Sequence, residues 1–425
     1  LSDEKNGVKR QPTESLEAYN YYLRGRYYLL EQDWTKSNLT IAIQMFQNAI
    51  ACDLEFIDAY TYLARAYLTL YSQREQLDEH RNLAKQAIDK ALAMHSGSSA
   101  VYVALGSYYS VLGEFEKALE AFELGMQADG NSIDCNLGVA RAWRRMGRFE
   151  QSIDLFKHVF QMSPRDAKLA WDIGWTYVDM RQYDKAEQFY NRSMSLAPDQ
   201  ISILDHLAWH IFLRKGDTHK ALGVLKTVPE DNEYYDMIPY YQVRLKICER
   251  DYTEALEILK KAPERLCSHR WDQHYRPPRS FLVGLLFWIK GDYQQARGSF
   301  DSAIEILESD IRKNPKSIRN RSSLGIAYAG TGRKEEAIHE GKQAVDNLPI
   351  SKDALSGALP IFDLILIYMM VGEYDLALDR VEQLLIHPCD EFSTVTMRID
   401  PIWDPLRDHP RFQALIEKYE KIHGI

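Results

Sequence analysis

Residues 324–349, LGIAYAGTGRKEEAIHEGKQAVDNLP, contain the pattern that decides the fold. A small residue, Gly325, is followed one helical turn later by an aromatic residue, Tyr328. The small residue allows a neighbouring helix to approach closely, and the ring fills the space beside it. Gly332 suits a left-handed turn at the end of a helix, and Pro349 ends a second helix. The stretch therefore predicts two antiparallel helices joined by a tight turn.

This block recurs along the chain. A Gly or Arg is followed five residues later by a small residue at eight places, which begin at Gly113, Gly147, Arg181, Gly216, Arg250, Gly291, Gly332 and Gly372. An upstream position, small in most copies, extends the series to ten: Gly25, Ala64, Gly106, Ala140, Gly174, Ala208, Val243, Gly284, Gly325 and Ile365. One helix pair cannot bury its own apolar face, but stacked copies can. The sequence therefore predicts a helical repeat array.

The pattern resembles the tetratricopeptide repeat. The residues that carry the resemblance best are Leu324, Gly325, Tyr328, Gly332, Ala337, Ala344 and Pro349, and the three central spacings of 34 residues equal the period of that family. The resemblance implies an all-α fold, a right-handed superhelical solenoid of about ten helix-turn-helix repeats. We expect it to cover residues 17–385, with a long inter-repeat loop at 264–280.

The two ends of the sequence resemble a more specific class of proteins that contain such arrays. Residues 1–16 look like the lead-in that joins a preceding domain to such arrays in multidomain bacterial signalling regulators, whose output domains are kinases, nucleotide cyclases or winged helices. Residues 386–425 look like the segment that ends the same arrays. Within it, Phe412, Leu415 and Ile416 follow i, i+3, i+4 spacing, which predicts a capping helix over the apolar face of the last repeat.

Composition excludes several classes of function. The net charge of the 425 residues is −9, which disfavours nucleic acid as a partner. The longest uninterrupted apolar run, Phe281–Ile289, is too short to span a membrane. Five dispersed cysteines argue against a disulfide framework or a structural zinc site and favour a reducing compartment. We expect a cytoplasmic location; the alternative is the periplasmic portion of a membrane-anchored regulator.

No catalytic motif is visible. Gly341-Lys342 lacks the upstream glycine of a phosphate-binding loop, and His339-Glu340 lacks the second histidine of a zinc protease helix. Cys267, His269 and His274 come nearest to a set of metal ligands, but an ordered connecting loop is the simpler interpretation. The sequence therefore predicts no catalytic residue, no metal and no cofactor, and the chain is not expected to be an enzyme.

The first helix of each repeat lines the concave face in the family that this chain resembles. Arg141, Trp175 and Trp209 stand at one repeat position, one residue after the small residue, at intervals of 34 residues. Their neighbours on the same expected surface are Arg144, Arg145, Trp171, Asp172, Asp205, His206 and Phe212. Aromatic walls with arginines suit a peptide or an anionic ligand. The other interpretation is that these side chains only pack between repeats.

Three functions remain open at this point. The leading hypothesis is a non-catalytic scaffold that binds a protein or peptide in its groove and regulates an upstream output domain. The second is a small-molecule sensor whose ligand lies against Trp171, Trp175 and Trp209. The third is a structural module for self-association, and the oligomeric state is not indicated by the sequence.

Overall fold

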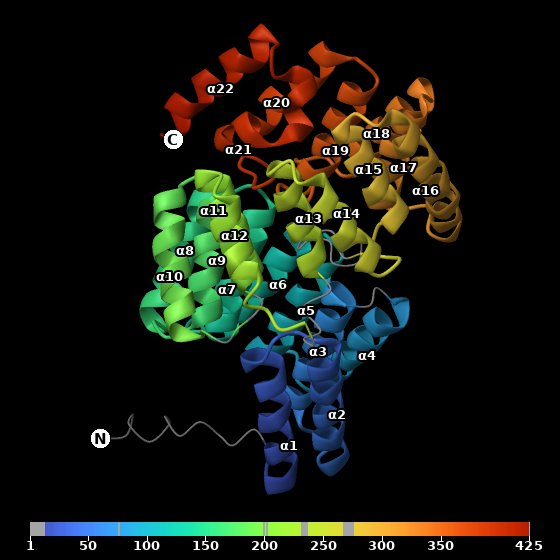
Figure 1. The fold of residues 1–425 in the computed structure, drawn as a ribbon. Coiled ribbons are helices and arrows are strands. Elements are labelled where there is room, and N and C mark those ends of the chain that lie inside the picture. The colour runs from blue at the N-terminus through green and yellow to red at the C-terminus, as the bar shows by residue number, and fades with distance from the viewer. Residues whose placement is uncertain are drawn as a thin grey trace. The chain divides into compact units, whose positions relative to one another are not determined.

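A computed structural model describes residues 13–74, 77–198, 200, 203–230, 237–266 and 276–424. Within these ranges the chain forms helices and no β-strand, apart from one antiparallel bridge between Arg265 and Pro278. The expected all-α fold of helix-turn-helix repeats is therefore confirmed. The chain divides into two compact units, residues 1–142 and 143–425, which are described separately below (Figure 1).

The N-terminal unit contains three helix pairs and most of a further helix. Its elements are α1 (Leu16–Arg26) with η2 (Tyr27–Glu31), α2 (Lys36–Cys52), α3 (Ile57–Gln73), α4 (Asp78–Met94), α5 (Ser99–Val111), α6 (Phe115–Ala128) and α7 (Ile133–Arg145), which crosses the unit boundary. At Gly25 a Cβ atom would lie 2.6 Å from the ring of Phe46, so only glycine allows α1 to approach α2 this closely. This is the role that the sequence predicts for the small residue.

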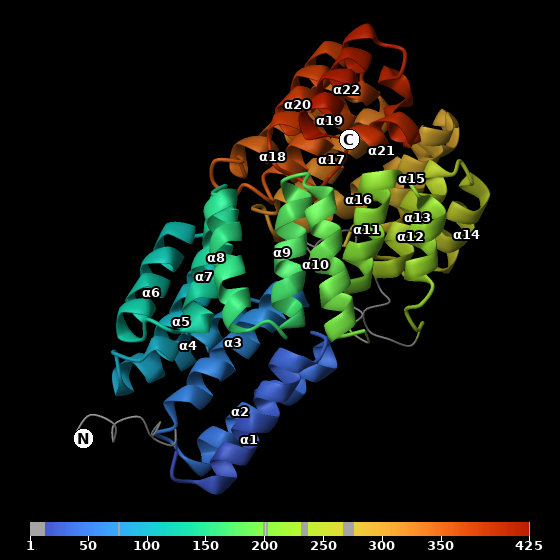
Figure 2. The same cartoon turned by 90° about the vertical axis from the view of Figure 1, so that its left-hand side faces the viewer.

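The C-terminal unit continues the pairs. Its elements are α8 (Phe149–Met162), α9 (Ala167–Asp179), α10 (Tyr183–Leu196), α11 (Leu204–Lys215), α12 (Thr218–Leu225), α13 (Ile238–Cys248), α14 (Tyr252–Lys261), α15 (Arg279–Lys290), α16 (Tyr293–Lys313), α17 (Ile318–Thr331), α18 (Lys334–Asn347), α19 (Ala358–Met370), α20 (Tyr374–Ile386), α21 (Thr394–Ile399), η5 (Pro401–Leu406) and α22 (Pro410–His423). Figure 2 shows α9/α10, α11/α12 and α13/α14 standing side by side as successive hairpins.

The turns between paired helices confirm the eight predicted positions. Each of the eight Gly or Arg residues has a positive φ, between 55° and 85°. Glycine adopts this left-handed conformation without a steric penalty, whereas other residues are strained in it. Arg181 (φ 55°) and Arg250 (φ 58°) therefore hold a conformation that glycine holds in the other six turns.

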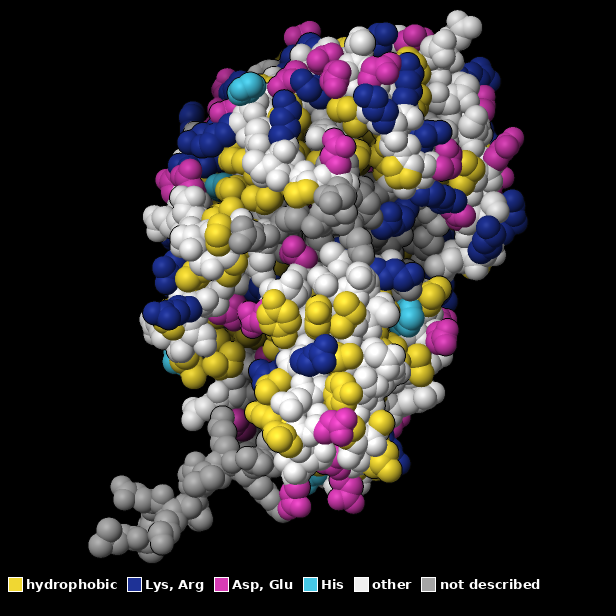
Figure 3. All heavy atoms as spheres, turned by 60° about the horizontal axis from the view of Figure 1, so that its bottom comes forward, with side chains coloured by type: hydrophobic (Ala, Val, Ile, Leu, Met, Phe, Trp, Pro, Cys, Tyr) yellow, Lys and Arg dark blue, Asp and Glu magenta, His cyan; other side chains and the backbone are white. Residues whose placement is uncertain are grey.

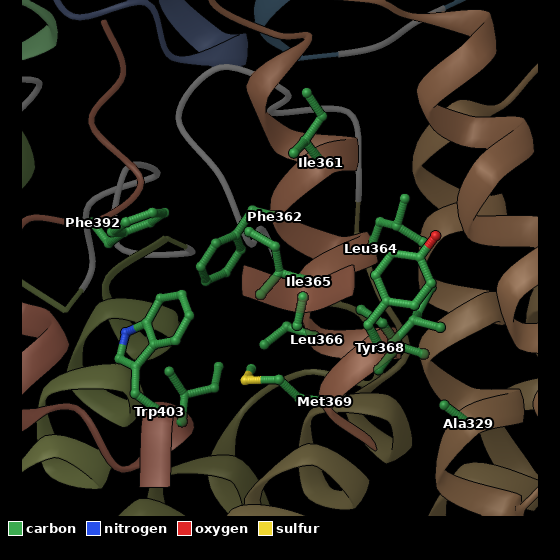
Figure 4. Packing of buried hydrophobic residues seen from close by; sticks show 14 of the residues in the cluster. Ala329, Ile361, Phe362, Leu364, Ile365, Leu366, Tyr368, Met369, Phe392 and Trp403 are labelled. Carbon is green, nitrogen blue, oxygen red and sulfur yellow. The ribbon is translucent and has the colours of Figure 1, made fainter. Parts of the chain in front are cut away.

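The last repeat and the segment after it share one apolar core. Helix α19 is buried on nearly every side, and the ring of its Phe362 lies 6.0 Å from Trp403 and 5.9 Å from Phe392 (Figure 4). Phe412, Leu415 and Ile416 of α22 are buried in the same core. The predicted capping residues thus lie against the last repeat, and their contribution to stability stays a prediction.

A stretch of the C-terminal unit, residues 387–404, returns to earlier repeats of that unit. We call it the return segment. Its residues form hydrogen bonds in or near three successive interhelical turns. Arg181 donates to the backbone oxygen of His387, Ser393 donates to that of Leu213, and Arg250 donates to the carboxylate of Asp404. The segment therefore covers part of α9–α14 from within the same unit, which affects the exposure of the predicted groove residues.

Candidate binding groove

Most of the predicted groove positions are buried. The expectation of exposure is wrong for Arg144, Asp172, Trp175, Asp205, His206, Trp209 and Phe212, all of which are less than 9% exposed. Trp171 and Arg145 are partly exposed, and Arg141, which belongs to the N-terminal unit, is exposed. Whether any of these residues contacts a partner stays a prediction.

The indole of Trp175 is covered by a buried ion pair. The guanidinium of Arg144 donates from Nη2 to Oδ1 of Asp172 at 3.1 Å and from Nη1 to Oγ1 of Thr176 at 3.0 Å. Its central carbon lies 4.1 Å from the centre of the Trp175 ring. Buried charges need such partners because water no longer solvates them. Arg144 and Asp172 are therefore paired with each other and are not available as a free pair of binding groups.

Trp171 and His206 complete an aromatic cluster on α9 and α11. The centres of the Trp171 and Trp175 rings are 5.2 Å apart, and the ring of His206 lies 4.7 Å from Trp171 in an edge-to-face arrangement. The structure thus brings three predicted residues together, Trp171, Trp175 and His206, and a fourth, Arg144, lies over the ring of Trp175. Only Trp171 retains a partly exposed surface.

Trp209 is held by the return segment. Its indole Nε1 donates to the backbone oxygen of Asp390 at 2.8 Å, and its ring contacts Phe212 at 5.1 Å and Tyr241 at 5.9 Å between ring centres. Arg145 is likewise bound to the carboxylate of Asp353. The surface expected to be an open wall is thus occupied in part by residues that lie far downstream in the chain.

Residues at the same repeat position line a pocket elsewhere in the C-terminal unit. One residue after the small position, the four later copies have Arg244, Leu285, Ile326 and Leu366. All four line one pocket, formed by the first helices α13, α15, α17 and α19 of successive repeats. We call this the C-terminal groove. Its other lining residues are Tyr240, Val243, Ile247, Pro277, Phe281, Leu282, Arg319, Ser323, Leu359, Phe362, Asp363, Glu391 and Ile402.

The C-terminal groove combines an apolar wall with a polar edge. Its cavity volume is about 70 Å³. Arg319 donates from Nη1 to Oδ2 of Asp363 at 2.7 Å, and both side chains are mostly buried. On the opposite helix the guanidinium of Arg244 lies 3.4 Å from the carboxylate of Asp400 in the return segment. A few placed polar groups in an apolar concavity are typical of binding sites, where they orient the ligand.

Sequence reasoning missed Arg319 and Asp363. A signal for Asp363 was present, because it interrupts the apolar run from Leu359 to Val371, and a lone carboxylate in such a run requires a partner. Arg319, 44 residues earlier, cannot be identified as that partner without the fold.

Other sites are not indicated in the described part of the chain. Among these residues no group of three or more His, Cys, Asp or Glu could hold a metal ion, and no helix is both long and apolar enough to cross a membrane. The candidate ligands Cys267, His269 and His274 lie outside the described residues.

Comparison with known proteins identifies the repeat. Residues 99–132 and 144–208 match the tetratricopeptide repeat family. The bovine BBSome complex member BBS4 is 22% identical over 213 residues, which are 48% of this chain and 37% of that protein. The CTR9 homologue of Arabidopsis thaliana is 25% identical over 302 residues, 68% of this chain and 25% of that protein. The chain thus spans well under half the length of either relative.

Solved structures with a similar fold include a tetratricopeptide protein of Thermus thermophilus, 17% identical, with a TM-score of 0.39 over 46% of this chain and 100% of that one. Human IFIT1, solved with PPP-AAAA, is 15% identical, with a TM-score of 0.45 over 73% of this chain and 68% of that one. Arrays of this repeat are generally non-catalytic and typically serve as scaffolds for protein interactions. The chain contains tetratricopeptide repeats, matched in residues 99–132 and 144–208.

Proposed function

We propose that this chain is a non-catalytic scaffold that holds a segment of a protein partner in the C-terminal groove. The observation that supports the proposal is the wall itself, in which Leu285, Ile326 and Leu366 come from three successive repeats at one register position. Leu285 is partly exposed, whereas Ile326 and Leu366 are 2% and 3% exposed. A row of apolar side chains along a concave surface matches the side chains of a peptide that lies along it.

The polar edge supplies orientation. The ion pair between Arg319 and Asp363 lies at the same wall, and Arg244 lies at the side formed by the return segment. An apolar side chain of the partner would be buried against the wall, while its backbone or a polar neighbour meets these charged groups. The groove therefore suits a mixed peptide better than a wholly apolar ligand.

The wider role follows from the two ends of the sequence. Their resemblance to multidomain bacterial regulators supports a regulatory or sensory module within a larger signalling protein, in the cytoplasm. The bovine relative is by name a member of a multiprotein complex, which fits a scaffold equally well. In either setting the chain itself supplies binding and no chemistry.

Site-specific photo-crosslinking tests the proposal. A benzophenone amino acid at Leu285, which is partly exposed in the groove, should capture a protein partner in cells. The matched control position is Tyr293 on α16, which is 65% exposed and lies outside the groove. Capture from position 285 should weaken when Tyr240→Glu is added, because Tyr240 also lines the groove and is partly exposed, and the melting temperature should stay within a few degrees of the parent.

Two results would contradict the proposal. Equal capture from positions 285 and 293 would show that the groove is not the contact. A metabolite-sized compound that raises the melting temperature of the wild type but not of Leu285→Glu would favour the small-molecule sensor instead.

A further inference from the structure

Arg26 is a cation that contacts two aromatic rings and forms no ion pair among the residues that the structure describes. Its guanidinium carbon lies 5.6 Å from the ring centre of Tyr22 and 5.3 Å from that of Tyr62. Within the described residues it makes no hydrogen bond or ion pair, and its Nε, which is buried, has no acceptor. Buried donors without acceptors are rare in folded proteins, and each requires an explanation.

The ring of Tyr62 lies between two arginines. The guanidinium carbon of Arg65 lies 4.7 Å from its ring centre, and Nη1 of Arg65 donates to Oδ2 of Asp134 at 2.9 Å. The ring of Tyr22 meets that of Tyr62 edge to face, with centres 5.3 Å apart. Two packed tyrosines thus hold two guanidinium groups, and only that of Arg65 has a carboxylate partner.

The repeat register places these arginines with others. Arg26, Arg65 and Arg141 each stand one residue after the small position of their repeat, the position that lines the groove in the C-terminal unit. The face that Figure 3 brings forward carries hydrophobic, basic and acidic side chains together. Three of the four N-terminal copies therefore have arginine at this position and the fourth has Ser107, whereas the last three copies have leucine or isoleucine.

The local charge is unbalanced. Arg65, with smaller effects of Arg141 and Arg26, lowers the pKa of Asp134, so this carboxylate is ionised beside three cations. Burial raises the pKa of Asp58, and Arg26 opposes this shift. The three arginines, Arg26, Arg65 and Arg141, outnumber the two acids, so the cluster retains a positive excess that an incoming anion can neutralise.

We propose that Tyr22, Arg26, Tyr62 and Arg65 form a binding site for a carboxylate or phosphate group carried on a peptide. A guanidinium presents paired donors whose geometry matches both anions, and tyrosine rings keep it oriented while its donors stay available. The site lies in the N-terminal unit and uses charge instead of an apolar wall. It does not depend on the C-terminal groove.

A peptide fits this site better than a nucleic acid. Asp58 and Asp134 lie close to the arginines and would repel a run of phosphates, and the whole chain has a net charge of −9. One or two anionic groups, spaced by uncharged residues, meet the cations without facing the acids.

Fluorescence anisotropy on the full chain tests the proposal. The probes are three fluorescein-labelled octapeptides in which alanine alternates with glutamate, phosphoserine or glutamine. The glutamate or the phosphoserine peptide should bind at least about tenfold more tightly than the glutamine peptide. Comparison of the two acidic peptides then distinguishes a carboxylate from a phosphate ligand.

Two variants locate the site. Arg26→Gln should weaken binding of the acidic peptides by about tenfold or more, whereas Arg24→Gln, an exposed arginine on the same helix, should leave it unchanged. Arg26→Lys retains the charge without the paired donors, and its affinity for the acidic peptides should lie between those of the wild type and Arg26→Gln. Burial disfavours the charged form of Arg26, but the nearby Tyr62, Tyr22 and Asp134 favour it more and raise its pKa, so Arg26→Gln should melt slightly below the wild type.

Three results would overturn the proposal. The first is failure of both acidic peptides to bind the wild type. The second is an equal loss of binding in Arg24→Gln and Arg26→Gln. The third is tighter binding of a labelled 12-nucleotide RNA that Arg26→Gln abolishes, which would assign the site to nucleic acid. If Arg26→Gln does not fold, Arg26→Lys, which retains the charge, provides the comparison with Arg24→Gln.

Discussion

Replacing Arg181 by glycine should destabilise the chain, although glycine suits the backbone at this position better. Arg181 has a φ of 55°, in the left-handed region. Its side chain donates from Nη1 to the backbone oxygen of His387 at 2.8 Å and from Nη2 to that of Leu384 at 3.0 Å. Arg181→Gly therefore has two opposing effects on the free energy of unfolding. It relieves backbone strain, and it removes the hydrogen bonds that hold the return segment.

The free-energy cost of losing these hydrogen bonds exceeds the gain from relieving the backbone strain. Relief of left-handed strain stabilises by ~1–2 kcal/mol, of which ~0.4–1 kcal/mol is lost because glycine makes the unfolded chain more flexible. Two carbonyl groups that lose their donors cost ~1–3 kcal/mol each, and the removal of a buried charge offsets part of that cost. The expected net effect is a loss of ~2–4 kcal/mol.

Arg250 is the matched control. It has the same left-handed backbone, with φ 58°, and a two-point ion pair to Asp404 at 2.8 and 3.0 Å, but its side chain is 53% exposed. Exposed ion pairs contribute ~0.2–1 kcal/mol, which is close to the strain that glycine relieves. Arg250→Gly should therefore change the stability by less than ~1 kcal/mol.

Urea unfolding followed by circular dichroism measures both variants. The reasoning predicts a clearly lower midpoint for Arg181→Gly and a midpoint near that of the wild type for Arg250→Gly. Equal shifts in the two variants, or a stabilised Arg181→Gly, would show that the bonds to the return segment do not set the stability of this unit.

Four further outcomes are expected. Gly298→Ala should raise the urea midpoint, because Gly298 lies in open space on α16 and alanine favours a helix by ~1 kcal/mol over glycine. Gly325→Ala should lower the midpoint, because the new Cβ would lie 3.0 Å from a backbone oxygen of α18. Trp175→Ala should cost ~3–5 kcal/mol of folding free energy, since the indole is 4% exposed, and an unchanged melting temperature would restore it as a surface anchor. Burial, with a smaller effect of the nearby Arg214, lowers the pKa of His210 from 6.5 to about 4. Because the unfolded chain takes up a proton first, the free energy of unfolding should fall as the pH drops from 6.5 towards 4. His210→Phe should make the dependence of stability on pH weaker in this range. Truncation after Pro388 removes Trp403 and α22 from the apolar core and should lower both stability and solubility, and a truncated chain that melts like the wild type would rule out a cap.

The helix pairs and their turns were readable from residue spacing. Gly325 and Tyr328, one turn apart, identify the first helix of a repeat, and a Gly or Arg after it identifies the turn. These features are local, because helical periodicity depends on residues within a few positions and a left-handed turn depends on one φ angle. The structure places every predicted turn residue in that conformation.

Exposure, by contrast, depended on parts of the chain far apart in sequence. Trp209 and Leu285 stand at the same repeat position, yet Trp209 is buried beneath Asp390, 181 residues later, whereas Leu285 lines an open pocket. Arg319 and Asp363 form an ion pair only because successive repeats stack. Repeat periodicity specifies which side of a helix faces the concave surface, but the path of residues 387–404 specifies which copies of that surface remain free, and no local pattern encodes that path.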